Sequence, residues 1–190
     1  FLGHVHRHPA RIWFRHCADE SGLLVKVEAR VVLDGGAYAS TTSAVLANAC
    51  CFSVGPYSVP NALIEGWGVR TNNPPCGAMR GFGNVQTCFA AEAQMDKLAS
   101  ALSMDPVELR LLNALKTGDT LITGQKITGT APVKEVLTSL SEYPIPKGTQ
   151  GNILELPGGT GRTTDSSHVK RGIGYAASIK NLMFSEGFDD

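Results

Sequence analysis

The residues best suited to chemistry are concentrated in one irregular segment, 71–83, with the sequence TNNPPCGAMRGFG. Its two prolines lack amide donors and its three glycines tolerate positive φ, which excludes regular structure. A helix is predicted directly after it, and the first turn of a helix offers unpaired amides and the positive end of its dipole. With the guanidinium of Arg80 added, the segment predicts an anion contact at Arg80, Gly81, Phe82 and Gly83.

A purely structural explanation of the same segment stays open. In that explanation 71–83 is a tight loop and Arg80 forms an ion pair with a carboxylate elsewhere. The sequence contains neither the Gly-x-Gly-x-x-Gly nor the Gly-Lys-Ser pattern that specifies a nucleotide site. The residues therefore indicate an anion site without identifying the anion.

A second group of interest is His4, His6 and His8, which alternate along the chain. Alternate side chains of a strand share a face, so three imidazoles could bind a transition metal there. No carboxylate lies nearby in the sequence to orient them, and we therefore predict no metal site. A hydrolase triad is not predicted either, because a Gly-x-Ser-x-Gly elbow is missing and His168 lies in an irregular stretch.

Composition excludes several classes of protein. The 17 basic and 17 acidic residues give no net charge, so neither nucleic acid nor an anionic membrane is expected as a partner. No apolar run approaches the roughly 18 residues that a membrane-spanning helix needs. The five cysteines are an odd set without a C-x-x-C pair, which predicts free thiols in the cytoplasm. The 190 residues suffice for a core without staples.

The strands that must support the segment are predicted from periodicity. A hairpin is expected from 11–17 and 23–33, which flank a polar turn, and a further strand at 62–69. In 23–33 the residues expected to face the core are Leu23, Val25, Val27, Ala29 and Val31.

Helices are predicted from apolar spacing and capping signals. Asn84 is expected to cap the helix that follows the irregular segment, and Asp105, with Pro106 and Glu108 after it, is expected to cap the next. The predicted helices are 43–51, 84–102, 106–116 and 132–140, and strand-like composition returns at 171–183.

These elements predict an α+β fold in which helices pack on antiparallel strands. Residues 1–142 are expected to form one α+β unit. Residues 143–167 are rich in Pro, Gly, Ser and Thr and are expected to be a connector, and 168–190 the start of a following domain.

Several short motifs follow one another in a fixed order: Arg7-His8-Pro9, Asp34-Gly35-Gly36-Ala37-Tyr38, Pro56-Tyr57-Ser58-Val59-Pro60-Asn61, Thr71-Asn72-Asn73-Pro74-Pro75, Met79-Arg80-Gly81-Phe82-Gly83 with Gln86, and Asp105-Pro106-Val107-Glu108-Leu109-Arg110. Together they resemble the molybdenum-binding subunit of the xanthine dehydrogenase and aldehyde oxidase family. The resemblance covers 7–125 and returns at 171–185. It implies oxidative hydroxylation with water as the oxygen source and a molybdopterin-type molybdenum cofactor.

The resemblance also implies roles for individual residues. Arg80 and Gly81 are expected to contact the molybdopterin. Phe82 and Phe184 are expected to pack on the substrate ring, with the Ser185 hydroxyl beside them. Two phenyl faces favour a nitrogen heterocycle, of the purine-like kind, over an aliphatic aldehyde, because ring contacts add about 0.5 to 1.5 kcal/mol beyond burial. The alternative is that both phenylalanines belong to the core.

Departures from the family pattern limit these expectations. Asn48 stands at the substrate-binding position where xanthine-oxidising members carry an arginine, and an amide has no charge, so xanthine itself is not favoured. The catalytic glutamate is expected beyond Asp190 and further site residues before Phe1. The chain, which starts at Phe1 rather than Met, is therefore expected to be an excised segment without catalytic residues, inactive on its own.

The expected partners follow from the same resemblance. They are the remaining domains of the same subunit, iron-sulfur and FAD-containing domains or subunits, and a small heterocyclic substrate. A non-catalytic scaffold or interaction module that retains the fold is the alternative.

Overall fold

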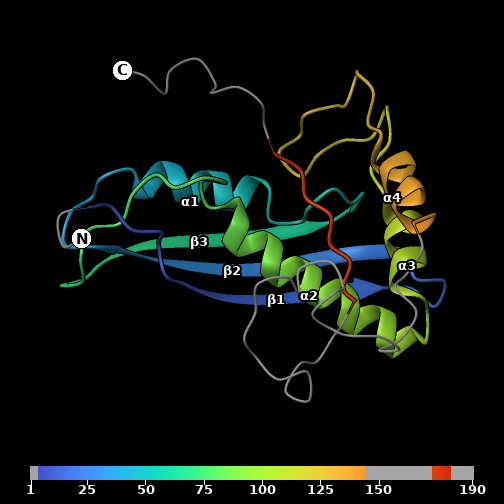
Figure 1. Cartoon of the computed structure of the whole chain (residues 1–190), viewed down its shortest axis with the longest axis horizontal. Coiled ribbons are helices and arrows are strands. Elements are labelled where there is room, and N and C mark those ends of the chain that lie inside the picture. The colour runs from blue at the N-terminus through green and yellow to red at the C-terminus, as the bar shows by residue number, and fades with distance from the viewer. Residues whose placement is uncertain (1–3, 144–172, 181–190) are drawn as a thin grey trace, which may run out of the picture.

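The computed structural model describes residues 4–143 and 173–180, which form a small sheet with helices packed on it (Figure 1). The α+β class predicted from the sequence is confirmed. In chain order the elements are β1 (Ala10–Ala18), β2 (Leu24–Gly36), α1 (Thr42–Cys51), β3 (Ala62–Arg70), α2 (Asn84–Leu102), α3 (Pro106–Asn113) and α4 (Val133–Ser141).

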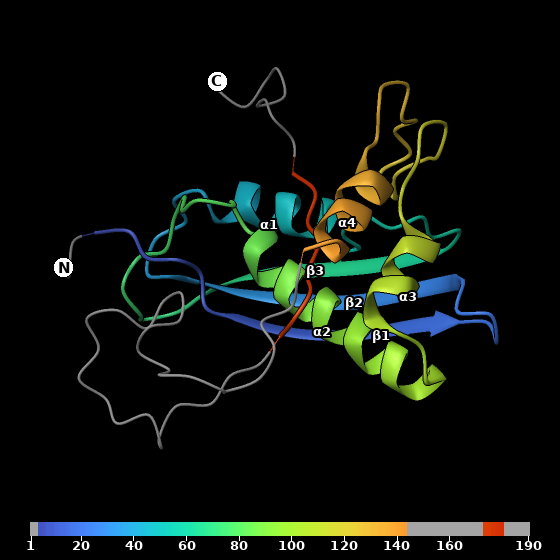
Figure 2. The ribbon, with the colours of Figure 1, turned by 45° about the vertical axis from the view of Figure 1, so that its right-hand side comes forward.

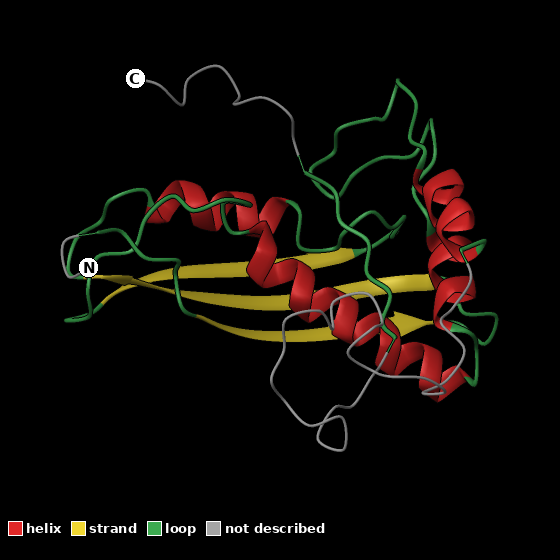
Figure 3. Ribbon diagram, in the orientation of Figure 1, coloured by secondary structure: helices red, strands yellow, loops and turns green. Residues whose placement is uncertain are grey.

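The three strands lie in the order β1-β2-β3, and the sheet is mixed (Figure 3). β1 and β2 form the predicted antiparallel hairpin, but β3 pairs with β2 in parallel, so the prediction of antiparallel strands is wrong for β3. The physical reason is the connection between β2 and β3. This connection contains α1. A connection that crosses the sheet through a helix brings the chain back to the end at which β2 began, so that β3 runs in the same direction as β2.

The alternation predicted for β2 fails at its beginning. Leu23 and Val25 lie at the surface, and Leu24 is buried instead. A register shift at this end of the hairpin, where Ala18 pairs with Leu24, changes which side chains face the core. Beyond the shift the predicted alternation of apolar residues is confirmed: Val27, Ala29, Val31 and Leu33 are buried, although Glu28 on the other face is buried as well.

The helices α1 and α2 lie on the same face of the sheet (Figure 2). α1 covers β2 and β3, and α2 crosses β1. Within the described residues no element covers the opposite face, on which Trp13, Leu63, Trp67 and Val69 are exposed. In the described part of the chain, one side of the sheet is thus packed and the other is open.

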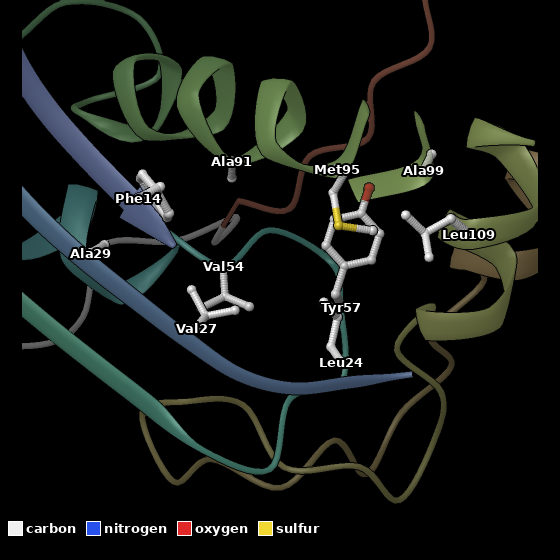
Figure 4. Packing of buried hydrophobic residues seen from close by; sticks show 10 residues of the cluster. All are labelled: Phe14, Leu24, Val27, Ala29, Val54, Tyr57, Ala91, Met95, Ala99 and Leu109. Carbon is white, nitrogen blue, oxygen red and sulfur yellow. The ribbon is translucent and has the colours of Figure 1, made fainter. Parts of the chain in front are cut away.

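The main core lies between the strands, α2 and α3 (Figure 4). Met95 and Ala91 of α2 and Val27 of β2 are fully buried in it. Complete burial of a side chain as large as valine or methionine contributes about 1.5 to 3 kcal/mol. A smaller cluster of Val31, Leu33 and Val45, against which Phe82 packs, joins α1 to the sheet next to the 71–83 segment.

The helix ends agree only partly with the predicted caps. Asp105 caps α3, because its Oδ1 accepts hydrogen bonds from the amides of Val107 at 2.8 Å and Glu108 at 3.0 Å. Asn84 does not cap α2: Gly83 takes that position, and no side chain caps the first turn. α3 ends at Asn113, earlier than predicted, and the Asn113 side-chain amide donates to the Gly22 and Leu109 carbonyls.

Several sequence predictions fall wholly or partly outside the described residues. The 143–167 connector lies outside except for Tyr143, and the boundaries at 142 and 168 stay predictions. Of the strand-like stretch 171–183, residues 173–180 are described and contain no strand. No helix among the described residues is long and apolar enough to cross a membrane.

Candidate cofactor and substrate site

The end of the 71–83 segment has an unusual backbone. Gly81, Phe82 and Gly83 have φ values of 89°, 47° and 92°, so three consecutive residues lie in the left-handed region. The turn is closed by the Phe82 amide, which donates to the Met79 carbonyl at 2.8 Å, and by the Asn84 amide, which donates to Gly81 at 3.0 Å. Positive φ is costly for a residue with a Cβ, so the conformation of Phe82 is imposed by its surroundings.

α1 supplies much of that support. A Cβ on Gly83 would collide with the Val45 carbonyl oxygen and come within 2.9 Å of the Ala49 Cβ. Only glycine therefore lets the turn approach α1 this closely. Beside this contact, the Asn48 amide nitrogen donates to the Phe82 carbonyl at 2.6 Å.

The beginning of the segment is fixed to the end of β2 by Asp34. The Thr71 hydroxyl donates to Asp34 Oδ1 at 2.6 Å, the Gly36 amide donates to the same oxygen at 2.9 Å, and the Asn73 amide donates to Oδ2. These hydrogen bonds, that of Thr71 first, hold the pKa of Asp34 below its usual value. Both ends of the segment are thus anchored.

Arg80 is exposed on this support. Its carbonyl accepts a hydrogen bond from Arg7 Nη2 at 2.7 Å. The ion pairs found in the described part of the chain involve Arg15, Lys26, Arg30 and Arg110 but not Arg80. The structural explanation, in which Arg80 pairs with a carboxylate, thus finds no partner among the described residues.

Two buried polar atoms beside the turn lack a partner within the described residues: Arg7 Nη1, a donor, and Gln86 Oε1, an acceptor. Gln86 uses its other amide atom to donate to the His8 carbonyl at 3.1 Å. Leaving such a group unpaired costs about 1 to 3 kcal/mol. An open hollow next to Gln86 is lined by Ala10, Ile12, Val85, Phe89 and Ala90.

These groups match the chemistry of a pterin cofactor. A pterin ring presents donors and acceptors along one edge and its side chain carries a phosphate. The guanidinium groups of Arg80 and Arg7 suit the anion, and the Gln86 oxygen suits a ring N–H. The residues present therefore fit a molybdopterin.

The three alternating histidines do not converge. His4 and His6 are exposed, whereas His8 is buried with its Nε2 2.9 Å from the Thr42 hydroxyl. Burial lowers the pKa of His8. Among the described residues no group of three or more His, Cys, Asp or Glu could hold a metal ion.

The structure brings together most of the predicted site residues. Arg80 is exposed, Gly81 and Phe82 are partly buried, and Asn48 contacts the Phe82 main chain. Phe184 and Ser185 lie outside the described residues, and their roles stay predictions. Sequence reasoning assigned no role to Arg7 or Lys180. The Arg7-His8-Pro9 motif could have pointed to Arg7, but nothing in the sequence places Lys180 beside Asn48.

Comparison with known proteins identifies the family of the chain. Residues 1–114 match the family model of the molybdopterin cofactor-binding domain. A probable xanthine dehydrogenase component of Bacillus subtilis is 40% identical over 96% of this chain and 25% of its own length. The nicotinate dehydrogenase large molybdopterin subunit of Eubacterium barkeri is 41% identical over 72% of this chain and 32% of its own.

Two solved structures share the fold. The aldehyde oxidoreductase of Desulfovibrio gigas superposes with a TM-score of 0.68 at 33% identity, over 71% of this chain and 15% of that one. The quinoline 2-oxidoreductase of Pseudomonas putida 86 gives 0.67 at 29% identity, over 74% and 19%. The chain thus spans a third or less of the length of these relatives. It belongs to the molybdopterin cofactor-binding domain family of molybdenum hydroxylase large subunits.

Proposed function

We propose that the chain forms part of the cofactor and substrate site of a molybdenum hydroxylase that oxidises a nitrogen heterocycle. The observation that carries the proposal is the turn at 80–83. It combines an exposed arginine with two buried polar atoms, Arg7 Nη1 and Gln86 Oε1, that lack protein partners in the described chain. When bound, the cofactor takes up the electrons of the substrate, while water supplies the oxygen.

The residues of this chain would bind the cofactor and orient the substrate. Arg80 and Arg7 neutralise the anionic part of the cofactor, and Gln86 accepts from its ring, while the Gly81 main chain permits close approach. Phe82, which is only partly buried beside the Val31, Leu33 and Val45 cluster, would present the accessible part of its ring to the substrate, and the Asn48 hydrogen bond to its carbonyl would hold it in place. No residue of this chain is assigned to proton transfer, because the catalytic glutamate is proposed to lie elsewhere in the subunit.

The substrate class rests on Phe82 and on Asn48. An aromatic ring next to the cofactor turn favours a flat heterocycle, of which a purine-like ring is one form, over an aliphatic aldehyde. The uncharged Asn48 does not favour xanthine. The names of relatives support ring substrates, since they include nicotinate dehydrogenase and quinoline 2-oxidoreductase, although an aldehyde oxidoreductase is also among them.

The remaining catalytic parts would come from partners. We propose that the other domains of the subunit complete the substrate site and that iron-sulfur and flavin domains or subunits carry the electrons away. The five free cysteines fit the reducing cytoplasm proposed for this assembly. The 190-residue chain alone is proposed to be inactive.

The test compares the complete enzyme with two variants. Arg80→Ala should lower the molybdenum and pterin content of the purified enzyme severalfold, because a guanidinium facing the cofactor anion is lost. Arg11→Ala removes an exposed arginine of β1 and should leave the content unchanged. Wild-type enzyme that contains neither molybdenum nor pterin when expressed with cofactor supply would refute the proposal and favour the scaffold alternative.

The role of Phe82 is tested by kinetics in the same enzyme. Phe82→Ala should raise the KM for heterocycles about tenfold, since a stacking face and its buried area are lost together. The KM for a small aliphatic aldehyde, which offers no ring to stack, should change much less. Equal KM values for heterocycles in variant and wild type would show that Phe82 serves only the core.

A further inference from the structure

Residues 173–180 run along α2 although they lie far from it in the sequence (Figure 1). α2 holds their main chain with side chains two turns apart. The Asn84 amide donates to the Ile179 carbonyl at 2.7 Å, and Glu92 Oε2 accepts from the Ala177 amide at 3.0 Å. Residues at this spacing share one face of a helix, so 177–179 is docked on a continuous strip of α2.

The Glu92 end of this strip is rigid. Glu92 is 5% exposed, and Arg110, which is fully buried, donates to it from Nε at 2.8 Å. The Tyr57 hydroxyl donates to the other carboxylate oxygen at 2.6 Å. A buried carboxylate held from two sides is preorganised for the amide of Ala177.

This docking determines where Lys180 lies. Its ammonium group is 3.1 Å from Asn48 Oδ1 and 5.5 Å from the centre of the Phe52 ring. The other end of the Asn48 amide donates to the Phe82 carbonyl at 2.6 Å. One side-chain amide therefore connects the Lys180 charge to the turn that carries Phe82.

We propose that Lys180 is a specificity-determining residue that favours ring substrates with an anionic substituent, such as a carboxylate, and that Asn84 and Glu92 position it. This inference rests on the proposed function, because it assumes a ring bound at Phe82. A positive charge placed at a fixed point beside a ring site attracts an anionic substituent and contributes little to a neutral ring. Lys180 is exposed, so its ammonium group stays accessible to an anionic substituent of the substrate.

The experiment uses the complete holoenzyme and two pyridine probes of nearly the same shape. Nicotinate carries a carboxylate, and nicotinamide carries a neutral amide in its place. The measurements are kcat/KM and the dissociation constant from isothermal titration calorimetry, which does not depend on turnover. Wild-type enzyme should prefer nicotinate in both.

Lys180→Met keeps a similar length but removes the charge. It should weaken nicotinate binding about tenfold or more, while nicotinamide binding changes less than about twofold. Lys180→Arg keeps the charge and should retain most of the preference. Lys97→Met, which removes an exposed lysine of α2, is the matched control and should behave as wild type.

Asn84→Ala tests the positioning role. Loss of its hydrogen bond to Ile179 should reduce the preference for nicotinate, in the same direction as Lys180→Met but to a smaller extent. A purely structural role of Asn84 would instead lower the affinity for both probes alike. Equal effects of Lys180→Met on both probes, or none, would overturn the inference and leave the proposed function intact. Enzyme that contains molybdenum but neither binds nor oxidises any nitrogen heterocycle, these two rings included, would overturn both.

Discussion

Gly83 is the single residue on which the cofactor turn depends most. Gly83→Ala should lower the free energy of unfolding by about 2 to 4 kcal/mol, because the new Cβ would meet α1 in a backbone with φ of 92°. Gly118→Ala is the control, since Gly118 has φ of 94° with no atom within 4 Å of the Cβ position. Chemical denaturation measures the free energy of unfolding of both variants. The difference between them gives the effect of the collision with α1, because backbone strain is common to both. Equal losses would mean that α1 does not confine the turn.

His16 makes a prediction about pH. Both of its ring nitrogens are buried without a partner among the described residues, and burial lowers its pKa to about 4 from 6.5. Below pH 6.5 His16 therefore becomes protonated in the unfolded chain but stays neutral in the folded chain until the pH approaches 4. Stability should fall by up to about 3 kcal/mol as the pH drops from 6.5 to about 4.

The control is His16→Phe, which keeps a ring next to Phe14 but cannot be protonated. Urea unfolding at several pH values between about 7 and about 4 should show a flatter curve for this variant. Parallel curves for the variant and the wild type would contradict the assignment of the slope to His16.

At the scale of elements, a buried ionic network joins α2 to α3. Arg110 of α3 donates to Glu92 at 2.8 Å and to Asp96 at 2.8 Å, both in α2. The Arg110 side chain is fully buried, whereas that of Asp96 is 54% exposed. The two pairs should therefore contribute very differently to stability.

Arg110→Met should destabilise the chain by about 3 to 5 kcal/mol, because it leaves the Glu92 carboxylate buried without a cation. Asp96→Asn should cost less than about 1 kcal/mol, since water screens an exposed pair. The double variant Arg110→Met with Glu92→Met should recover part of the loss. Urea midpoints measure all three, and a harmless Arg110→Met would show that Glu92 is readily protonated or hydrated.

Elements with local signals were predictable from the sequence. The hairpin, the four helices and the Asp105 cap follow from periodicity and capping residues. Features that depend on contacts between distant residues could not be predicted. Asn84 has a residue type suited to capping, but it lies within α2 and its side chain contacts Ile179, and the parallel pairing of β3 depends on how α1 crosses the sheet.

The same division applies to the site. That Arg80, Phe82 and the glycines lie together in one turn was predictable, because all belong to one irregular segment next to a helix start; their roles toward cofactor and substrate stay predictions. Arg7 contacts Arg80, which is 73 positions away, and Lys180 contacts Asn48, which is 132 positions away. Sequence spacing does not predict contacts between residues so far apart. Phe82 also carries a positive φ of 47°, which its residue type gives no reason to expect.

At the scale of the molecule, the described residues leave uncovered the face of the sheet that points away from α1 and α2. Trp13 and Trp67 are each 47% exposed there, and Leu63 is 52% exposed. Apolar side chains grouped on one face of a sheet favour association. The chain produced alone should therefore self-associate at micromolar concentration.

Leu63→Lys with Trp67→Lys should shift the isolated chain toward monomer in sedimentation velocity, because two charges on β3 oppose face-to-face contact. Tyr38→Ser, which changes a side chain that is 68% exposed beyond the end of β2, should have no such effect. A wild-type chain that sediments as a monomer would contradict the prediction.

The way the cofactor turn is tied to the rest of the chain has a consequence for biogenesis. Its supports come from residues near both ends of the described chain, through the hydrogen bonds of Arg7 to Arg80 and of Lys180 to Asn48. Contacts between such distant positions form late, because the chain must first be brought together at an entropic cost. We therefore expect the cofactor to be inserted after folding, into a preformed receptor, rather than to nucleate the fold during synthesis.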